Sequence, residues 1–198
     1  MSGIGPNPKR LERFFQDSGR AGLIDHLKSH ALRTDGTFTL RSGLITSWYL
    51  DARKTTLDGP GALLVARAVL AVLDGRARGV GGMTMGADPM AVATAVLGTL
   101  EGRELAAFSV RKEEKAHGSG GRLVGPLRPG DAVAVLEDTA TTGGALLEAI
   151  DVVEEAGLQP LQAVALLDRS GGVVASRLRG RGIPYAALLA PADLGVAE

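Results

Sequence analysis

Residues 131–150 constrain the fold of this chain more than any other stretch. They read DAVAVLEDTATTGGALLEAI, and their first apolar run, 132–136, is dense enough for a strand buried on both faces. Two acids, Glu137 and Asp138, follow this run, and a loop of small residues then leads into a segment with helical apolar spacing, 145–150. The stretch therefore predicts a strand, an acid pair, a loop and a helix, as in an open α/β sheet.

The acid pair and the loop have the chemistry of a sugar phosphate site. Glycines and short hydroxyl side chains let backbone N–H groups approach an anion, and the positive end of the next helix favours a phosphate. Carboxylates at the end of a parallel strand lie where such sheets bind ligands, and they accept hydrogen bonds from sugar hydroxyls. The turn matches neither a Walker A loop nor a dinucleotide fingerprint. We therefore expect a ribose 5-phosphate site; the alternative is a glycine-rich helix entry beside two surface acids.

The run VAVLEDTATTGG resembles the phosphoribosyl pyrophosphate (PRPP) binding motif of the type I phosphoribosyltransferases. The resemblance implies their fold, an α/β architecture with a central, mainly parallel sheet flanked by helices and a small N-terminal hood. It also implies that Glu137 and Asp138 bind the ribose of PRPP, with Asp138 acting in catalysis. The rest of the motif would hold the 5′-phosphate, through Thr139, Ala140, Thr141, Thr142, Gly143, Gly144 and Ala145.

Length and composition narrow the possibilities further. The 198 residues suit one domain, which we divide into N-terminal helices with the hood, 1–55, and a PRPP-binding core, 56–198. Lys and Arg number 22, as do Asp and Glu, so no basic excess indicates a nucleic acid or membrane partner. The sequence shows no cysteine, no signal-peptide pattern and no apolar run of membrane-spanning length. We expect a cytoplasmic protein.

Two segments before the core predict short strands around a Ser-Gly turn, 38–43 and 45–51. The run FTLRSG, followed by SWYLDAR, is similar to the hood of the orotate phosphoribosyltransferases. By that resemblance Arg41 contacts the pyrophosphate of PRPP, and Tyr49 lines the orotate pocket. Taken alone, Trp48 and Tyr49 are more typical of core packing.

A second strand, loop and helix is predicted at 78–83, 84–88 and 90–100, with Asp88 as the helix N-cap. The backbone N–H groups of such a loop can bind pyrophosphate. In the resembling family this loop does so and often presents a lysine. This chain has no lysine anywhere in the three segments, which leaves a backbone site.

Four potential cations follow a strand predicted at 104–110 and precede a Gly and Ser tract: Arg111, Lys112, Lys115 and His117. Taken alone, such a charged run is equally typical of a solvated loop. The run RKEEKAHG is very similar to the active-site loop of the orotate phosphoribosyltransferases. The resemblance implies that the four side chains bind the departing pyrophosphate, Lys115 and His117 in catalytic roles. It also implies a homodimer in which this loop closes over the partner's active site.

A further buried strand, predicted at 161–167, ends in the sequence DRSGG. Arginine at a strand end can hold a carboxylate bidentately, although a surface salt bridge is the more ordinary role. The resemblance implies that Arg169 binds the carboxylate of orotate, with Tyr49 and Thr141 also at the base.

His26 and His30 are four residues apart on a helix predicted at 21–33, a spacing that allows a shared metal. No third ligand of suitable spacing accompanies them, and we favour a solvated helix face.

Together the motifs imply an orotate phosphoribosyltransferase that uses PRPP and Mg²⁺ to make orotidine 5′-monophosphate for pyrimidine synthesis. The metal would bind through the substrate, with Glu137 and Asp138 reaching it through water and no direct protein ligand assigned. Two alternatives remain. One is a phosphoribosyltransferase for another base, and the other is a non-catalytic regulator that binds PRPP.

Overall fold

The computed structural model describes residues 19–39, 45–114 and 121–197. Its centre is a six-stranded sheet with the order β10-β9-β8-β5-β6-β7, in which only the pairing of β6 with β7 is antiparallel. The predicted central, mainly parallel sheet is confirmed. Its strands are β5 (Gly79–Met83), β6 (Ala106–Val110), β7 (Leu123–Val124), β8 (Ala132–Ala140), β9 (Gln159–Asp168) and β10 (Tyr185–Leu189).

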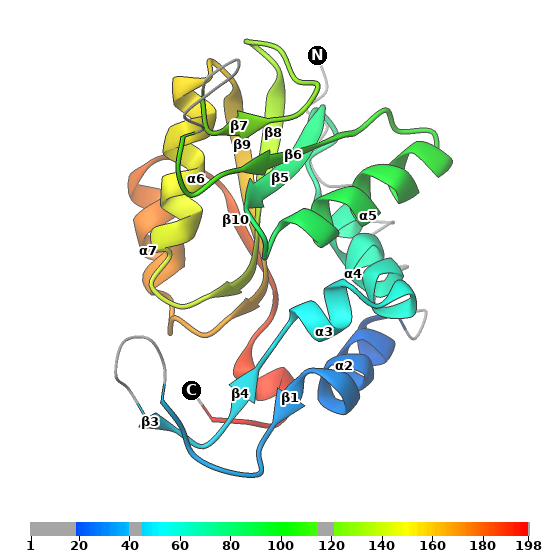
Figure 1. Cartoon of the computed structure of the whole chain (residues 1–198), viewed down its shortest axis with the longest axis vertical. Helices are drawn as coiled ribbons and strands as arrows, with labels where there is room; N and C mark the ends of the chain where they lie inside the picture. The colour runs from blue at the N-terminus through cyan, green and yellow to red at the C-terminus, as the bar shows by residue number, and fades with distance from the viewer. Residues whose placement is uncertain (1–18, 40–44, 115–120, 198) are drawn as a thin grey trace.

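Helices cover both faces of this sheet (Figure 1). One face carries α4 (Gly59–Val72) and α5 (Asp88–Leu100), and the other carries α6 (Gly144–Glu155) and α7 (Val173–Gly180). Alternate residues of β8 enter the two layers. Val133 and Val135 pack with the buried residues of α6 and α7, whereas Ala134 and Leu136 pack with those of α4 and α5. This burial on both faces explains the continuous apolar run in the sequence.

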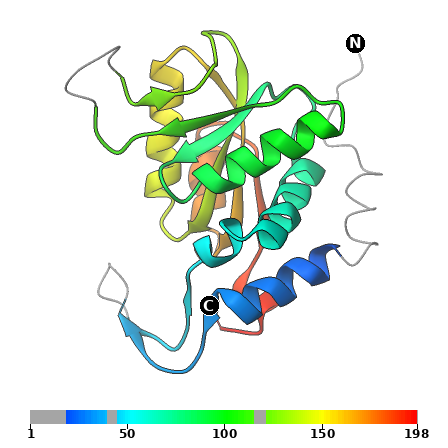
Figure 2. The ribbon, with the colours of Figure 1, turned by 45° about the vertical axis from the view of Figure 1, so that its right-hand side comes forward.

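The hood lies at the carboxyl edge of the sheet (Figure 2). Within it, β1 pairs with β4 and β2 pairs with β3, both antiparallel. The indole N–H of Trp48 donates to the carbonyl of Ala197 at 2.8 Å, so the end of the described chain returns to the hood. These elements are α2 (Gly19–His30), β1 (Leu32–Arg33), β2 (Phe38–Thr39), β3 (Ile45–Thr46), β4 (Tyr49–Leu50), α3 (Arg53–Thr56) and the 3-10 helix η1 (Pro191–Leu194).

The sheet reverses its winding direction between β5 and β8. From β5 the chain moves outward to β6, and from β8 it moves the opposite way to β9 and β10. Open α/β sheets bind ligands at the carboxyl ends of the strands on either side of such a reversal. The loops after β5 and β8 are the two small-residue loops identified in the sequence, so the topology places them side by side.

Two local predictions need correction. The helix predicted at 21–33 ends at His30, because Leu32 and Arg33 pair with β4 instead. Asp88 is not the N-cap of α5: Ala87 holds that position, and the Asp88 carboxylate accepts a hydrogen bond from the Thr84 hydroxyl at 2.6 Å. Strand pairing decides where the helix ends, and a hydrogen bond to the preceding loop decides the role of Asp88.

The predicted solvated helix face is wrong for His26. Its side chain is only 11% exposed, and its ring nitrogens contact the Thr55 hydroxyl at 3.1 Å and the Asp58 carboxylate at 2.9 Å. His30 is exposed, and its ring stacks on that of His26. Among the described helices, none is long and apolar enough to cross a membrane.

Candidate active site

The acid pair lies inside β8, which continues to Ala140 rather than ending at the acids as the sequence suggested. Asp138 is anchored by the N–H of Thr139, which donates to its Oδ1 at 2.7 Å. On the other side it meets the loop after β5: a Cβ built on Gly86 would lie 2.8 Å from the Asp138 carboxylate. Only glycine lets the two loops approach this closely, so the structure joins both predicted loops around one carboxylate.

Glu137 is the most perturbed carboxyl of the site. Burial, followed by repulsion from the neighbouring Asp138, raises its pKa to about 8. Its Oε2 is buried and has no hydrogen-bond partner among the described residues. A buried oxygen without a partner is costly, and one at the end of a central strand points to a ligand group as the missing partner. Tyr185 of β10 lies close enough for the charge of Glu137 to contribute to its raised pKa, after burial and Asp168.

Glu137→Gln is expected to flatten the pH dependence of stability between about pH 5 and pH 8. The native carboxyl keeps its proton up to about pH 8, whereas the unfolded chain releases it near the ordinary pKa of 4.5. The native state therefore binds more protons in this window, and the free energy of unfolding of the wild type falls as the pH rises. A neutral glutamine removes that fall, which urea unfolding at both ends of the window measures. The control Glu155→Gln, exposed on α6, keeps the wild-type slope; an unchanged slope in Glu137→Gln contradicts the perturbed pKa.

The loop after β8 has the form of an anion cup. It turns through Gly143, whose φ of 77° only glycine adopts easily, and α6 begins at the next residue. Thr141 and Thr142 are exposed, and no acceptor among the described residues takes their N–H groups. Arg177 of α7 donates to the Thr142 carbonyl at 2.6 Å, and this hydrogen bond ties the cup to α7. Free N–H groups at a helix N-terminus match the predicted phosphate site.

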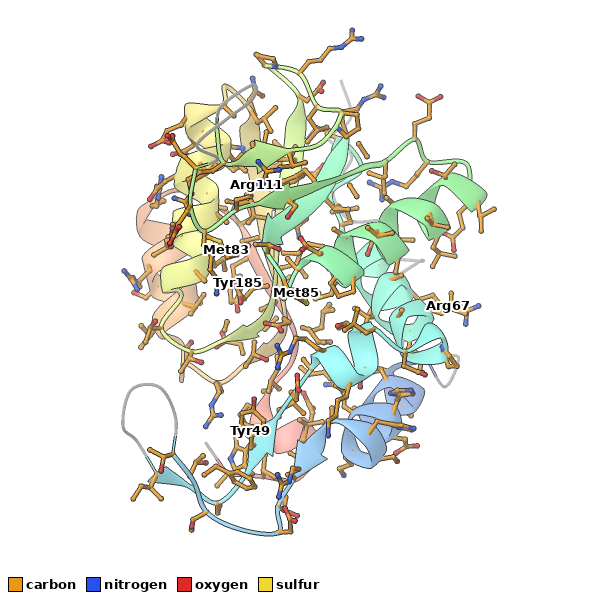
Figure 3. The ribbon with its side chains drawn as sticks, in the orientation of Figure 1. Tyr49, Arg67, Met83, Met85, Arg111 and Tyr185 are labelled. Carbon is orange, nitrogen blue, oxygen red and sulfur yellow. The ribbon has the colours of Figure 1, made fainter. Side chains whose placement is uncertain are left out.

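The loop after β5 presents a second set of free N–H groups. No described residue accepts a hydrogen bond from the N–H of Met85 or Gly86, and the Met85 side chain is 59% exposed. The peptide bond between Thr84 and Met85 is cis. Figure 3 shows Met85 at the centre of the molecule, between the sheet and α3. The loop therefore presents free backbone donors, and the anion site expected there stays a prediction.

Arg169 lies at the carboxyl end of β9 and stacks over the Trp48 ring at 3.9 Å. Partial burial lowers the pKa of its guanidinium, although it stays charged at neutral pH. No ion pair joins it to an acid of the described chain, so the surface salt bridge weighed from the sequence is absent there. The Tyr185 hydroxyl and the Ser170 N–H both donate to Asp168, at 3.1 and 2.7 Å, and fix the strand end that carries Arg169. A stacked, unpaired guanidinium is suited to a planar carboxylate ligand.

The basic segment begins directly after β6. Thr84 of the neighbouring loop donates to the carbonyl of Val110 at 2.9 Å, so Arg111 starts one residue beyond that contact. Arg111 and Lys112 are described, whereas Lys115, His117 and the hood residue Arg41 lie outside the described residues.

Tyr49 is 37% exposed on β4 and stacks on Phe38 at 5.8 Å between ring centroids. Figure 3 places it in the hood, apart from the central Met85. Trp48 is buried at 3% exposure, as expected for core packing, yet it also supports Arg169. No sequence pattern indicates this dual role, nor the contacts made by Arg177 and Tyr185, because no local pattern links residues so far apart.

Comparison with known proteins gives a consistent result. No protein-family model matches the chain. The orotate phosphoribosyltransferase of Streptomyces avermitilis is 44% identical over 172 residues, which cover 85% of this chain and 93% of that protein. A crystal structure of the Mycobacterium tuberculosis orotate phosphoribosyltransferase with Fe(III) dicitrate has a TM-score of 0.76 at 35% identity, covering 90% of this chain and 99% of that one. Another structure of that enzyme, in complex with PRPP, has a TM-score of 0.73 at 31% identity over the same shares.

Proposed function

The chain belongs to the orotate phosphoribosyltransferase family, and we propose that it transfers the 5-phosphoribosyl group of PRPP to orotate. The products are orotidine 5′-monophosphate and pyrophosphate, in the de novo synthesis of pyrimidines. The observation that carries the proposal is the meeting of Asp138 with Gly86 at the point where the sheet reverses direction, which brings an acid pair and two free N–H loops together. The M. tuberculosis relative, which has been solved with PRPP, supports the donor.

The donor fits the residues of β8 and its loop. We propose that Glu137 and Asp138 accept hydrogen bonds from the ribose hydroxyls, which would supply the partner that Glu137 Oε2 lacks. The 5′-phosphate lies on the free N–H groups of the cup. The cup consists of Thr139, Ala140, Thr141, Thr142, Gly143, Gly144 and Ala145.

Breakage of the bond to pyrophosphate leaves positive charge on the sugar and negative charge on the leaving group. The protein therefore contributes mainly position and electrostatic stabilisation. Asp138 stabilises the cationic sugar. Cations of the segment after β6 neutralise the leaving group, and Arg41 of the hood assists them. The cations of the segment are Arg111, Lys112, Lys115 and His117.

Orotate fits beside Arg169, whose guanidinium has no acidic partner in the described chain. We propose that it holds the orotate carboxylate while Tyr49 and Thr141 line the rest of the base pocket. A carboxylate ligand distinguishes this acceptor from uracil, adenine and hypoxanthine, which have none.

Magnesium is the cofactor that we propose. The site suits it, because Glu137 and Asp138 place carboxyl oxygens beside the expected ribose, and Asp88 Oδ1 is a second buried oxygen without a described partner. Mg²⁺ keeps several waters when bound, so the acids can reach it through water. Its chemistry is to add positive charge next to the pyrophosphate oxygens.

Orotate consumption by the purified protein tests the function, with PRPP and Mg²⁺ supplied together and each omitted in turn. We expect orotate to disappear only when both are present. If orotate is untouched, the same assay with uracil, adenine and hypoxanthine tests the alternative acceptors. Inactivity with all four bases, with PRPP still bound, would replace the proposal with a PRPP-binding regulator.

We further propose that the chain is a single unit of hood (1–55) and core (56–198), supported by the bond from Trp48 to Ala197, and that it acts as a homodimer. In the dimer, the segment after β6 would complete the site of the partner.

Mixing Lys115→Ala chains with Asp138→Asn chains is expected to restore activity that neither variant has alone. Random exchange of subunits should give about one quarter of the wild-type rate, because half of the dimers are mixed and each of these has one intact site. The rate is measured after subunit exchange, with mixed dimers verified by two affinity tags. No recovery in verified mixed dimers would show that the loop acts within its own subunit.

A further inference from the structure

A hollow of 480 Å³ lies between α3 and the loop after β5, on the side of that loop facing the hood. It is open to solvent and combines charged side chains with an exposed methionine. No role follows for it from the motifs in the sequence. Its lining residues are Asp51, Arg53, Lys54, Leu57, Asp58 and Met85.

Three of the four charged side chains that line this hollow have partners among the described residues, and the fourth, a lysine, does not. Arg53 donates to both oxygens of Asp51, at 2.8 and 3.2 Å, so these two charges neutralise each other. Asp58 is engaged by His26 at 2.9 Å and by the N–H of Gly61 at 3.1 Å. The Lys54 side chain is exposed, and no hydrogen bond or ion pair joins its ammonium group to any described residue; only its backbone N–H is bonded, to the Asp51 carbonyl at 3.1 Å. Within the described residues, the hollow therefore offers an ammonium group without a partner to a ligand.

The loop after β5 carries free backbone donors next to this hollow. Met85 borders the hollow, and its N–H and that of Gly86 have no acceptor among the described residues. Gly86 in turn touches the Asp138 carboxylate. The pKa of the Arg53 guanidinium is raised mainly by Asp51, and to a smaller extent by Tyr49 and Asp138. The Asp138 carboxylate is therefore close enough to Arg53 to interact with its charge. An anion on these N–H groups would thus lie between the ribose-binding acid and Lys54.

We propose that Lys54 binds the pyrophosphate group of the donor substrate. From α3, it supplies the positive charge that the loop after β5 does not carry, since that loop and its flanking elements contain no lysine. Arg53 lies next to Lys54 on α3, but its charge is balanced by Asp51, so Lys54 carries the free positive charge of this hollow. The identity of the anion rests on the proposed function, whereas the cationic hollow beside two free N–H groups does not.

The test measures pyrophosphate binding and turnover separately. Calorimetry with Mg²⁺ and inorganic pyrophosphate compares the wild type with Lys54→Ala, Lys54→Arg and the matched control Lys28→Ala, an exposed lysine on α2. We expect Lys54→Ala to raise the Kd for pyrophosphate and the KM for PRPP by roughly ten- to hundredfold, the range for a lost hydrogen bond to a charged group. The KM for orotate should stay unchanged, Lys54→Arg should recover most of the affinity, and Lys28→Ala should match the wild type.

The two proposals fail in different ways. If the wild type consumes orotate and Lys54→Ala binds pyrophosphate as tightly as Lys28→Ala does, Lys54 has no role in binding this group. If the wild type does not consume orotate but binds pyrophosphate through Lys54, the hollow is an anion site and the proposed function is overturned. An equal rise of the KM for orotate and the KM for PRPP would indicate a general disturbance of α3 and would reject the specific contact.

Discussion

Asp138→Asn is expected to lower kcat by about 10²–10³-fold, the loss typical of removing one preorganised electrostatic group from an active site. The carboxylate lies where positive charge develops on the ribose, and asparagine of the same shape carries no charge to stabilise it. Folding should be nearly unaffected. The asparagine oxygen can still accept the Thr139 N–H, and its size still fits against Gly86. Steady-state kinetics and thermal unfolding of the same preparation separate the two effects.

Asp131→Asn is the matched control for this substitution. Asp131 lies just before the amino end of the same strand, where its carboxylate accepts the N–H of Arg128 at 2.8 Å. The Asp131→Asn substitution makes the same change in charge at the opposite edge of the sheet, so the kcat of this variant should equal that of the wild type. Near-normal turnover in Asp138→Asn would exclude the carboxylate from the mechanism, and equal losses in both variants would point to net charge instead of position.

The order of strands, loops and helices in the core follows from local sequence patterns. The apolar run at 132–136 became the buried centre of β8, and the helical spacing at 145–150 became part of α6. Both patterns are visible within a few residues because burial on two faces demands an unbroken apolar strand, and a cup demands glycine. The acid pair and the small-residue loop could therefore be located along with the fold, whereas the ribose and phosphate assigned to them stay predictions.

The partners of the site residues could not be predicted in the same way. Trp48 and Arg169 meet only because the hood folds over the carboxyl edge of the sheet, and Lys54 and Met85 line one hollow for the same reason. Such contacts depend on how distant elements pack, and they leave no period or spacing in the sequence. His26 illustrates the opposite error: an ordinary helix position became a mostly buried imidazole that contacts the exposed carboxylate of Asp58.

Arg169→Ala is expected to lower kcat/KM for orotate by about 10²–10³-fold, because losing one partner of a desolvated charge pair typically costs about 2–5 kcal/mol. Arg169→Lys should recover little of this loss. A lysine cannot present the planar fork that matches a carboxylate, nor stack on Trp48 as a guanidinium does. The loss should appear mainly in the KM for orotate, while the KM for PRPP changes little. Kinetics with each substrate varied in turn measures this difference.

Arg179→Ala provides the control, since Arg179 is exposed on α7 and its loss should leave both KM values unchanged. The specificity for a carboxylated base gives a stricter test. If Arg169 holds the carboxylate, its removal should narrow the preference for orotate over uracil, because only orotate loses a contact. A variant with weakened turnover but an undiminished preference for orotate would show that another residue reads the carboxylate, and that the guanidinium stacked on Trp48 serves the structure of the hood.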